Sequence, residues 1–544
     1  MAEAAVPPPP EPGPASPPAP RRPRAPRPPR PAQVPEALQV PLAALAAMLL
    51  ALVLRLPARG LPIEGDAVAY GALAKSLAAG ERFTLDGAAH DRYPPGWPAV
   101  LAVPVVLGSS VTAAVRGTAW LLGGLAAALL VVLGARWSRG RLSLPLLVAL
   151  AAAHPDLALY AGGLVPGAEA LTLVLLLGAI LLAGTARPGA RLAALVLAGL
   201  LPLVRYDALP FAAGAAWLAW SEATGPRVRR ARGIAIAVAF GPLLLWAVRT
   251  WVATGAPWGA GYTHHGLDLG RLPRNLLVFL GLIVPVGSLV LLLPYAAKGL
   301  RTLWRGREAR SLVRTVLLAA AAHLLLVLLF AGPTGSAGGA LKFSSGSLRF
   351  GLAAWPFVFV AAAMAVTTEK PPLRRFVVGA VWVLTVPLAL HAVSGGLQRA
   401  LPAGPLAAGR LHALAETFDA AAAAAGPTDW IGFDLRPRTN EGVEVFLGER
   451  APRRTTGTFV APRPVEPRGR FPRAPVLPVD GPFPKDGQIL LVTDVPREGT
   501  VFTGDRPDLG IGGRGIFHRM RLLEVDAGRA GVYRVDAVKR PSPR

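Results

Sequence analysis

The 544-residue sequence contains no cysteine and is poor in charged residues, which make up only 16% of it. The absence of cysteine excludes disulfide bonds, iron–sulfur clusters and thiolate metal sites, and it leaves the redox compartment open. Because 53% of the residues are hydrophobic and the mean hydropathy is +0.45, the chain is too apolar for a soluble protein of this length. We therefore expect a membrane domain with a further domain attached.

Acidic residues are scarce: 32 Asp and Glu stand against 57 Lys and Arg, which gives a formal net charge of +25. Such a charge suggests a nucleic-acid partner. However, the basic residues are mostly Arg scattered between apolar runs, not gathered on one polar face with aromatic residues. We therefore expect no nucleic-acid partner.

Residues 1–36 have almost no apolar content and are rich in Pro and Arg, as in RRPRAPRPPRP at 21–31. They cannot bury a core, so we expect a disordered cytoplasmic tail. A cleavable signal peptide has an apolar stretch soon after a short basic start, whereas the apolar stretch here begins only near Leu38. We therefore expect an uncleaved first helix.

Apolar segments long enough to cross the roughly 30 Å hydrocarbon core of a bilayer recur through residues 37–395, and we expect about eleven spans. They lie near 38–56, 111–135, 142–161, 166–184, 190–204, 207–220, 233–253, 275–297, 312–332, 349–367 and 376–394. Seventeen Lys and Arg lie in five alternate loops, at 136–141, 185–191, 221–233, 298–311 and 368–375. The intervening short loops carry only four. This positive-inside pattern predicts a cytoplasmic N-terminus, with segment 57–97 and everything after residue 395 outside.

Residues 396–544 change in character. An Ala-rich helical stretch at 406–425 precedes short strand-like runs separated by Pro and Gly turns, at 431–435, 443–447, 488–495 and 531–538. We expect a small extracytoplasmic α/β domain, in which no motif specifies chemistry. The predicted fold class is mainly α, a polytopic transmembrane helical bundle carrying this C-terminal domain.

The first external segment, 57–97, contains a conspicuous carboxylate, Asp66. After it, Tyr70, Leu73 and Leu77 fall at helical spacing, which predicts an amphipathic helix on the membrane surface with Asp66 as its N-cap. One interpretation of Asp66 is a helix cap and nothing more. The other is a functional carboxylate.

Further ionisable residues are expected at the same membrane face as Asp66. Such groups at membrane depth are costly unless they face water, a partner or a ligand, so a cluster at one mouth of the bundle indicates a site. Its expected members are Glu169, Arg205, Asp207, His264, His265, Lys342 and Arg349.

Each member also has a structural interpretation. Arg205 could simply form an ion pair with Glu169 or Asp207. The two adjacent histidines could be a surface feature, since neighbouring histidines make a poor metal site. Arg349 opens an apolar helix and could be an interface anchor.

Six segments across roughly residues 38–395 resemble, in order, the C-type glycosyltransferase (GT-C) superfamily, in the branch of the protein O-mannosyltransferases and the lipid A aminoarabinose transferase. Asp66 with Tyr70 and Gly80 resembles the acidic motif of that family's first external loop. The other five are YPPGWP at 93–98, LVPGAEALTLVLLL at 164–177, AGLLPLVRYDALPF at 198–211, PLLLWAVRTWVATGAPW at 242–258 and LRFGLAAWPFVFVAAAMAV at 348–366.

The sequence departs from the family pattern in two places. It reads Gly-Asp at 65–66 where many relatives have Asp-Glu, so a neighbouring acid is missing unless Glu64 replaces it. It reads Arg-Phe at 349–350 where relatives have Arg-Tyr, which removes a hydroxyl group.

The resemblance implies a GT-C-like fold and a hexosyl- or pentosyltransferase of the cell envelope, in a bacterial-type inner membrane, that uses a polyprenyl-phosphate sugar. On this hypothesis Asp66 is the general base and Glu169 orients the acceptor or a divalent metal ion, which these two carboxylates would hold. The residues expected to bind the donor phosphate are Arg205, Lys342 and Arg349. The other substrate-binding candidates are Tyr70, Tyr93, His264 and His265.

Single-step attack on the donor predicts inversion at the anomeric carbon. The other expected partners are membrane lipids and an acceptor glycan, lipid or protein. Two alternatives stay open: a transporter or flippase of a lipid-linked saccharide, and a non-catalytic scaffold that presents the C-terminal domain. Against the transporter, the ionisable residues gather at one face and no paired interrupted helices are visible.

Overall fold

The computed structural model describes most of the helical part of the chain and five short strands near its end. The described residues are 36–58, 63, 66–80, 83–85, 88–90, 93–139, 141–162, 167–185, 187–255, 257, 270, 272–273, 276, 289–306, 310–330, 351–393, 430–434, 458–460, 489–493, 520–527 and 530–535. The predicted tail at 1–35 lies outside them.

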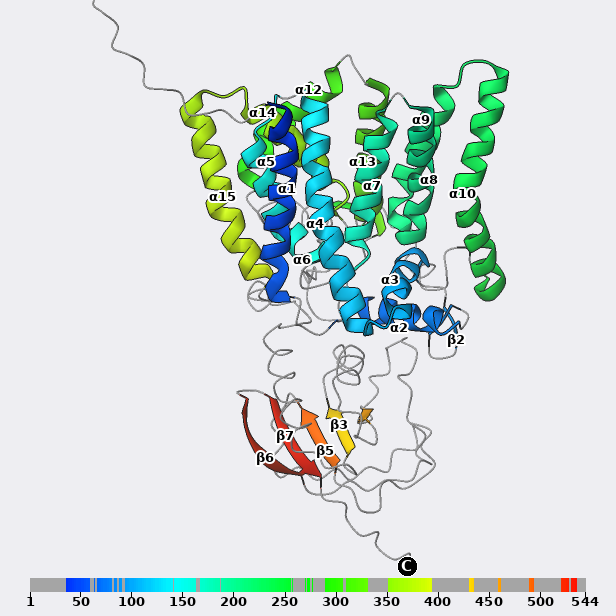
Figure 1. Cartoon of the computed structure of the whole chain (residues 1–544), viewed down its shortest axis with the longest axis vertical. Coiled ribbons are helices and arrows are strands. Elements are labelled where there is room, and N and C mark those ends of the chain that lie inside the picture. The colour runs from blue at the N-terminus through cyan, green and yellow to red at the C-terminus, as the bar shows by residue number, and fades with distance from the viewer. Residues whose placement is uncertain are drawn as a thin grey trace, which may run out of the picture.

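Five helices of the described part are long and apolar enough to cross a membrane. They are α1 (Glu36–Arg55), α4 (Val111–Ser138), α10 (Pro226–Thr254), α13 (Arg310–Phe330) and α15 (Pro371–Val393). All five run along the bundle axis (Figure 1). The prediction of a multi-pass membrane protein is therefore confirmed.

Shorter helices complete the helical part of the described chain. They are α3 (Gly96–Val106), α5 (Leu144–Ala153), α6 (Pro155–Tyr160), α7 (Glu169–Ala183), α8 (Pro188–Val204), α9 (Leu209–Ser221), α12 (Leu289–Arg305) and α14 (Trp355–Val366). Single 3-10 turns follow α1, at Leu56–Ala58, and α8, at Tyr206–Ala208. Every predicted span overlaps a helix, but the number of eleven membrane crossings stays a prediction.

α12 differs from its prediction because it continues to Arg305, through the first half of the predicted loop at 298–311. Its buried positions Leu292, Ala296 and Leu303 recur at helical spacing, so one apolar stripe continues past the predicted end. Figure 1 places this helix beside α14, and the two pack against each other.

The first external segment folds at one end of the bundle, where α2 (Asp66–Ala78) lies beside α3 (Figure 1). A helix forms where the sequence predicts one, with Tyr70 and Leu73 buried and Lys75 exposed. Ser76, expected beside Lys75 on the polar face, is buried instead, and the position of the helix on the membrane surface stays a prediction. A small antiparallel hairpin follows, formed by β1 (Thr84–Leu85) and β2 (Ala88–Ala89). α3 was not predicted as a separate helix.

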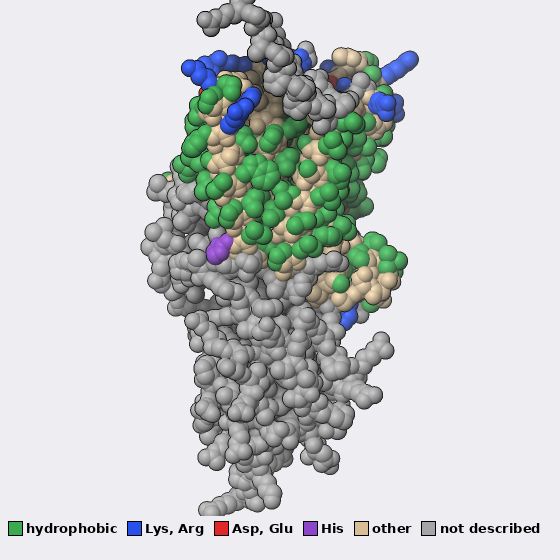
Figure 2. Space-filling view, turned by 60° about the vertical axis from the view of Figure 1, so that its left-hand side comes forward, with side chains coloured by type: hydrophobic (Ala, Val, Ile, Leu, Met, Phe, Trp, Pro, Cys, Tyr) green, Lys and Arg blue, Asp and Glu red, His purple; other side chains and the backbone are tan. Residues whose placement is uncertain are grey.

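The surface of the bundle is a broad apolar belt, and Lys and Arg side chains gather at the end opposite α2 (Figure 2). Exposed cations in the described loops and helix ends there include Arg139, Arg141, Arg187, Arg227, Arg305 and Arg375. This distribution fits the charge asymmetry read from the loops, which predicts that this end is cytoplasmic.

Five strands near the end of the chain form one sheet in the order β4-β3-β5-β7-β6. β3 pairs in parallel with β4 and β5, whereas β7 pairs antiparallel with β5 and β6. The strands are β3 (Trp430–Asp434), β4 (Thr458–Val460), β5 (Ile489–Thr493), β6 (Met520–Ala527) and β7 (Ala530–Val535). β3, β5 and β7 fall on predicted strands, while the expected strand at 443–447 and helix at 406–425 lie outside the described residues.

Candidate functional site

Asp66 opens α2 and accepts a hydrogen bond from the hydroxyl group of Tyr93, with 2.6 Å between the phenol oxygen and Oδ1. Tyr93 is buried, and it precedes α3. The ring of Tyr70, one helical turn after Asp66, lies 4.7 Å from the ring of Tyr93. The contact with Tyr93 gives Asp66 a specific side-chain partner besides its place at the start of α2, and the choice between a structural and a functional carboxylate stays a prediction. Both predicted tyrosines lie at this carboxylate.

The second predicted carboxylate, Glu169, lies at the start of α7 and forms an ion pair with Arg205. Arg205 is the C-cap residue of α8, and its backbone is extended. Its side chain also donates two hydrogen bonds to Asp207. Its Nη2 lies 2.7 Å from Asp207 Oδ2, and its Nε lies 2.9 Å from Asp207 Oδ1. One guanidinium therefore bridges two carboxylates from different helices.

Burial lowers the pKa of the Arg205 guanidinium, but the negative charges of Asp207 and Glu169 raise it by a larger amount. The net result is a pKa well above the ordinary value, so Arg205 stays charged. The structure thus contains the ion pair that the sequence left open as the structural interpretation of Arg205. Tyr70 and Tyr93 belong to the same buried hydrophobic cluster as Ala168 and Val204. The latter two directly precede Glu169 and Arg205, so the Asp66 and Glu169 clusters share one packed region.

A small pocket, with room for about one water molecule, lies against this ion pair. It is lined by Glu169, Thr172, Leu173, Arg205, Asp207, Ala208, His323, Leu352 and Ala353. The buried His323 on α13 contacts the backbone oxygen of Asp207 at 2.7 Å through Nδ1. That contact satisfies a carbonyl at a break between helices, which would otherwise be costly in an apolar medium.

The entry segment YPPGWP brings α3 close to Arg205. A Cβ atom on Gly96 would lie 2.7 Å from the backbone oxygen of Leu203, so only glycine allows this approach. The next residue, Trp97, is fully buried. The segment that contains Tyr93 is therefore packed against the end of α8.

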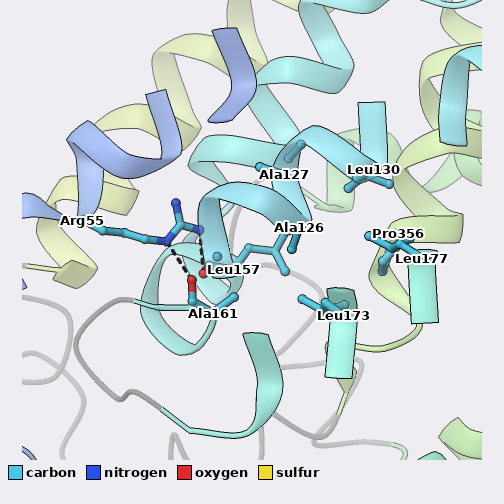
Figure 3. Close-up of a pocket in the computed structure, with 11 residues that line it drawn as sticks. Arg55, Ala126, Ala127, Leu130, Leu157, Ala161, Leu173, Leu177 and Pro356 are labelled. Atoms are coloured by element: carbon cyan, nitrogen blue, oxygen red, sulfur yellow. Dashed lines mark hydrogen bonds between the residues drawn. The ribbon is translucent and has the colours of Figure 1, made fainter. Parts of the chain in front are cut away.

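Arg55, at the end of α1, is a buried cation whose N–H groups donate to backbone carbonyls (Figure 3). The acceptor oxygens are those of Ala51, Ala152, Leu157 and Ala161, at 2.8, 3.3, 2.8 and 2.9 Å. They belong to the last turns of α1, α5 and α6, whose C-terminal dipoles favour a cation. Arg55 thus fastens the helix that leads to Asp66 onto the segment that leads to Glu169.

The two carboxylates offered to a divalent metal ion, Asp66 and Glu169, each bind a partner side chain. Within the described ranges, no three His, Asp or Glu side chains form a group that could hold a metal. Mg²⁺ commonly binds through one or two carboxylates together with substrate phosphate and water. The described residues do not form an all-protein cage, so a metal ion at Asp66 or Glu169 would need ligands from substrate phosphate and water.

Four predicted site residues, His264, His265, Lys342 and Arg349, lie outside the described residues, as does Glu64. Their roles stay predictions.

Sequence reasoning did not single out His90, Trp246, Arg249 or His323 as site residues. His323 had a signal, since it is an ionisable residue inside an apolar helix. Trp246 and Arg249 lie inside the quoted segment 242–258 but were given no role. His90 had none, because its contact with Tyr93 depends on the loop conformation.

No protein-family model matches the chain, and no curated protein matches it. Solved structures do. The crystal structure of ArnT from Cupriavidus metallidurans bound to undecaprenyl phosphate is 16% identical, with a TM-score of 0.54, over 92% of this chain and 98% of that one. The apo form of ArnT is 14% identical, with a TM-score of 0.52, over 91% and 97%.

An archaeal oligosaccharyltransferase from Archaeoglobus fulgidus in the apo form is a weaker match. It is 12% identical, with a TM-score of 0.46, over 66% of this chain and 56% of that one. The likeness to ArnT shows that the chain shares the fold of that structure, in agreement with the fold that the resemblance predicted.

Proposed function

We propose that the chain, which shares the fold of ArnT, is a membrane glycosyltransferase that moves a sugar from a polyprenyl-phosphate donor to an acceptor hydroxyl. One observation carries the proposal: the residues beside Asp66 pack in one hydrophobic cluster with those beside Glu169 and Arg205, in a fold shared with ArnT. The ArnT structure is bound to undecaprenyl phosphate, which supports a lipid phosphate as the carrier of the sugar here.

In the proposed reaction, Asp66 takes the proton of the acceptor hydroxyl while that oxygen attacks the anomeric carbon. The bond between the anomeric carbon and the phosphate oxygen breaks, and its electron pair leaves with the polyprenyl phosphate. Attack from the opposite side inverts the anomeric configuration. The hydroxyl group of Tyr93, 2.6 Å from Asp66 Oδ1, holds the carboxylate in one orientation for this step.

The ion-paired cluster has a positioning role in this proposal. Arg205 is engaged by Glu169 and Asp207, so it fixes the Glu169 carboxylate toward the acceptor side. In this proposal, Lys342 and Arg349 are the main residues that bind the donor phosphate.

A divalent metal ion stays part of the proposal as an optional component. When bound, it would neutralise charge on the leaving phosphate, and Asp66 or Glu169 would hold it. His264 and His265 are proposed to contact substrate, together with Tyr70. The proposed orientation has the N-terminus in the cytoplasm, and the site and the C-terminal domain outside a bacterial-type inner membrane.

One assay tests the proposal against its alternatives. Purified protein in lipid vesicles is incubated with labelled polyprenyl-phosphate sugars and a membrane extract that supplies acceptors. Loss of label from the lipid with gain in an acceptor supports the transferase. Movement of intact labelled lipid across the bilayer supports a transporter. If label is neither transferred nor moved, the result supports a scaffold. Repeating the assay with a chelator tests the metal ion.

A further inference from the structure

Arg249, half-buried on α10, reaches from the bundle to the first external loop. Its Nη1 donates to the backbone oxygen of His90, and its Nη2 donates to that of Phe83 at 3.2 Å. The backbone N–H of His90 donates to the same Phe83 oxygen at 3.0 Å. The guanidinium therefore holds both ends of the β1–β2 hairpin with two nitrogens at a fixed spacing, a geometry that the single nitrogen of a lysine does not reproduce.

The hairpin held by Arg249 in turn holds Tyr93. The side chain of His90 accepts a hydrogen bond from the backbone N–H of Tyr93, with 3.1 Å between the nitrogen atoms. The rings of His90 and Tyr93 are stacked, with centroids 5.3 Å apart and planes at 19°. The hydroxyl group of Tyr93 then donates to Asp66. A continuous series of contacts thus runs from α10 to the proposed base.

A second arm starts at Trp246, less than one helical turn before Arg249. Its ring lies 4.7 Å from the Arg249 guanidinium and meets the ring of Phe83 edge to face at 5.2 Å. The indole N–H of Trp246 donates to the hydroxyl group of Tyr206 at 2.7 Å. Tyr206 follows Arg205 directly in the chain. This arm reaches the ion-paired cluster.

We propose that Arg249 and Trp246 are a positioning pair that sets the Asp66 loop and the Arg205 turn at a fixed distance from each other. The proposal rests on the proposed transferase function. The pair acts through Tyr93 and Tyr206 and does not touch the reacting atoms. Its function is to align the base with the cluster that orients the acceptor.

Phosphate binding is the obvious alternative role for an external arginine, and a substitution that keeps the positive charge but changes the donor geometry separates the two roles. A phosphate ligand tolerates lysine, because an ammonium group also binds phosphate. A guanidinium that holds two carbonyl oxygens with two separate nitrogens is not replaced by the single nitrogen of lysine. Arg249→Lys should therefore behave like Arg249→Met under the proposal, and like the unchanged protein if Arg249 is a phosphate ligand.

The test measures transfer kinetics of the full-length protein in lipid for Arg249→Lys, Arg249→Met and Trp246→Phe. Arg229→Lys and Trp251→Phe are matched controls, since both residues lie on α10 and are exposed. Misalignment by about 1 Å can cost on the order of a hundredfold in rate. We expect a tenfold to hundredfold loss of kcat in all three variants, with the KM for the donor nearly unchanged, and no loss in the controls.

Amide hydrogen exchange supplies a readout that does not depend on activity. Peptides that contain Phe83, His90 and Tyr93 should exchange faster in Arg249→Lys, while peptides from α4 and α7 should not change. Normal kcat in Arg249→Lys, or unchanged exchange in those peptides, would overturn the proposal. Absence of transfer by the unchanged protein would instead refute the proposed function, and the exchange data would still decide the positioning contacts.

Discussion

Replacing Arg205 with alanine should destabilise the protein strongly, because this guanidinium bridges two carboxylates in a poorly hydrated place. The Arg205 side chain is 13% exposed and that of Glu169 only 4%. Removing one partner of a buried ion pair typically costs about 3–5 kcal/mol, since the other charge is left without compensation. We expect a loss near this range in the free energy of unfolding, measured by denaturant titration of the purified protein in mild detergent.

The chain offers a matched control in the pair between Arg191 and Glu222. Its atoms are 3.6 Å apart and its side chains are 48% and 37% exposed, and such surface pairs contribute about 0–1 kcal/mol. Arg191→Ala should therefore barely change the free energy of unfolding. If Arg205→Ala cost no more than Arg191→Ala, the view of Arg205 as the structural centre of the Glu169 cluster would be refuted.

Three further changes test other contacts. Tyr93→Phe removes a hydrogen bond to a carboxylate, which contributes up to about 1.5–3 kcal/mol to stability, and leaves the Asp66 carboxylate free to turn, so the transfer rate should fall roughly tenfold to hundredfold; an unchanged rate would count against the orienting role. Gly96→Val would press a side chain against the backbone oxygen of Leu203, so the yield of folded protein in detergent should drop, whereas Gly117→Val, at a helical position of α4 with open space around it, should cost far less. Arg349→Ala should raise the KM for the donor, and an unaltered KM would remove it from the phosphate site.

The helical architecture was largely predictable because membrane spans are recognised in a sequence by their length and apolarity. The prediction was weaker where packing decides the outcome. The span at 142–161 is two helices, since the chain leaves the helix at His154, before Pro155. α12 runs past its predicted end because the buried stripe that ends at Leu303 is set by α14.

The candidate site was predictable as a set of residue types at one membrane face, and only partly as a geometry. Asp66, Tyr70 and Tyr93 do meet, and so do Glu169 and Arg205. The sequence could not choose between a phosphate ligand and an ion pair for Arg205, because that depends on which groups face it across the bundle. The hydrogen bonds of Arg249 are likewise set by the loop conformation.

The most direct test of the central claim compares the unchanged protein with Asp66→Asn in the labelled-donor assay, with release of polyprenyl phosphate as the readout. Asn nearly preserves the size of the side chain and can still accept the hydrogen bond from Tyr93, but it cannot take a proton. We predict that the unchanged protein releases one polyprenyl phosphate for each sugar transferred, and that Asp66→Asn releases almost none while it keeps its fold and binds the donor. Transfer by Asp66→Asn at the rate of the unchanged protein would contradict the account.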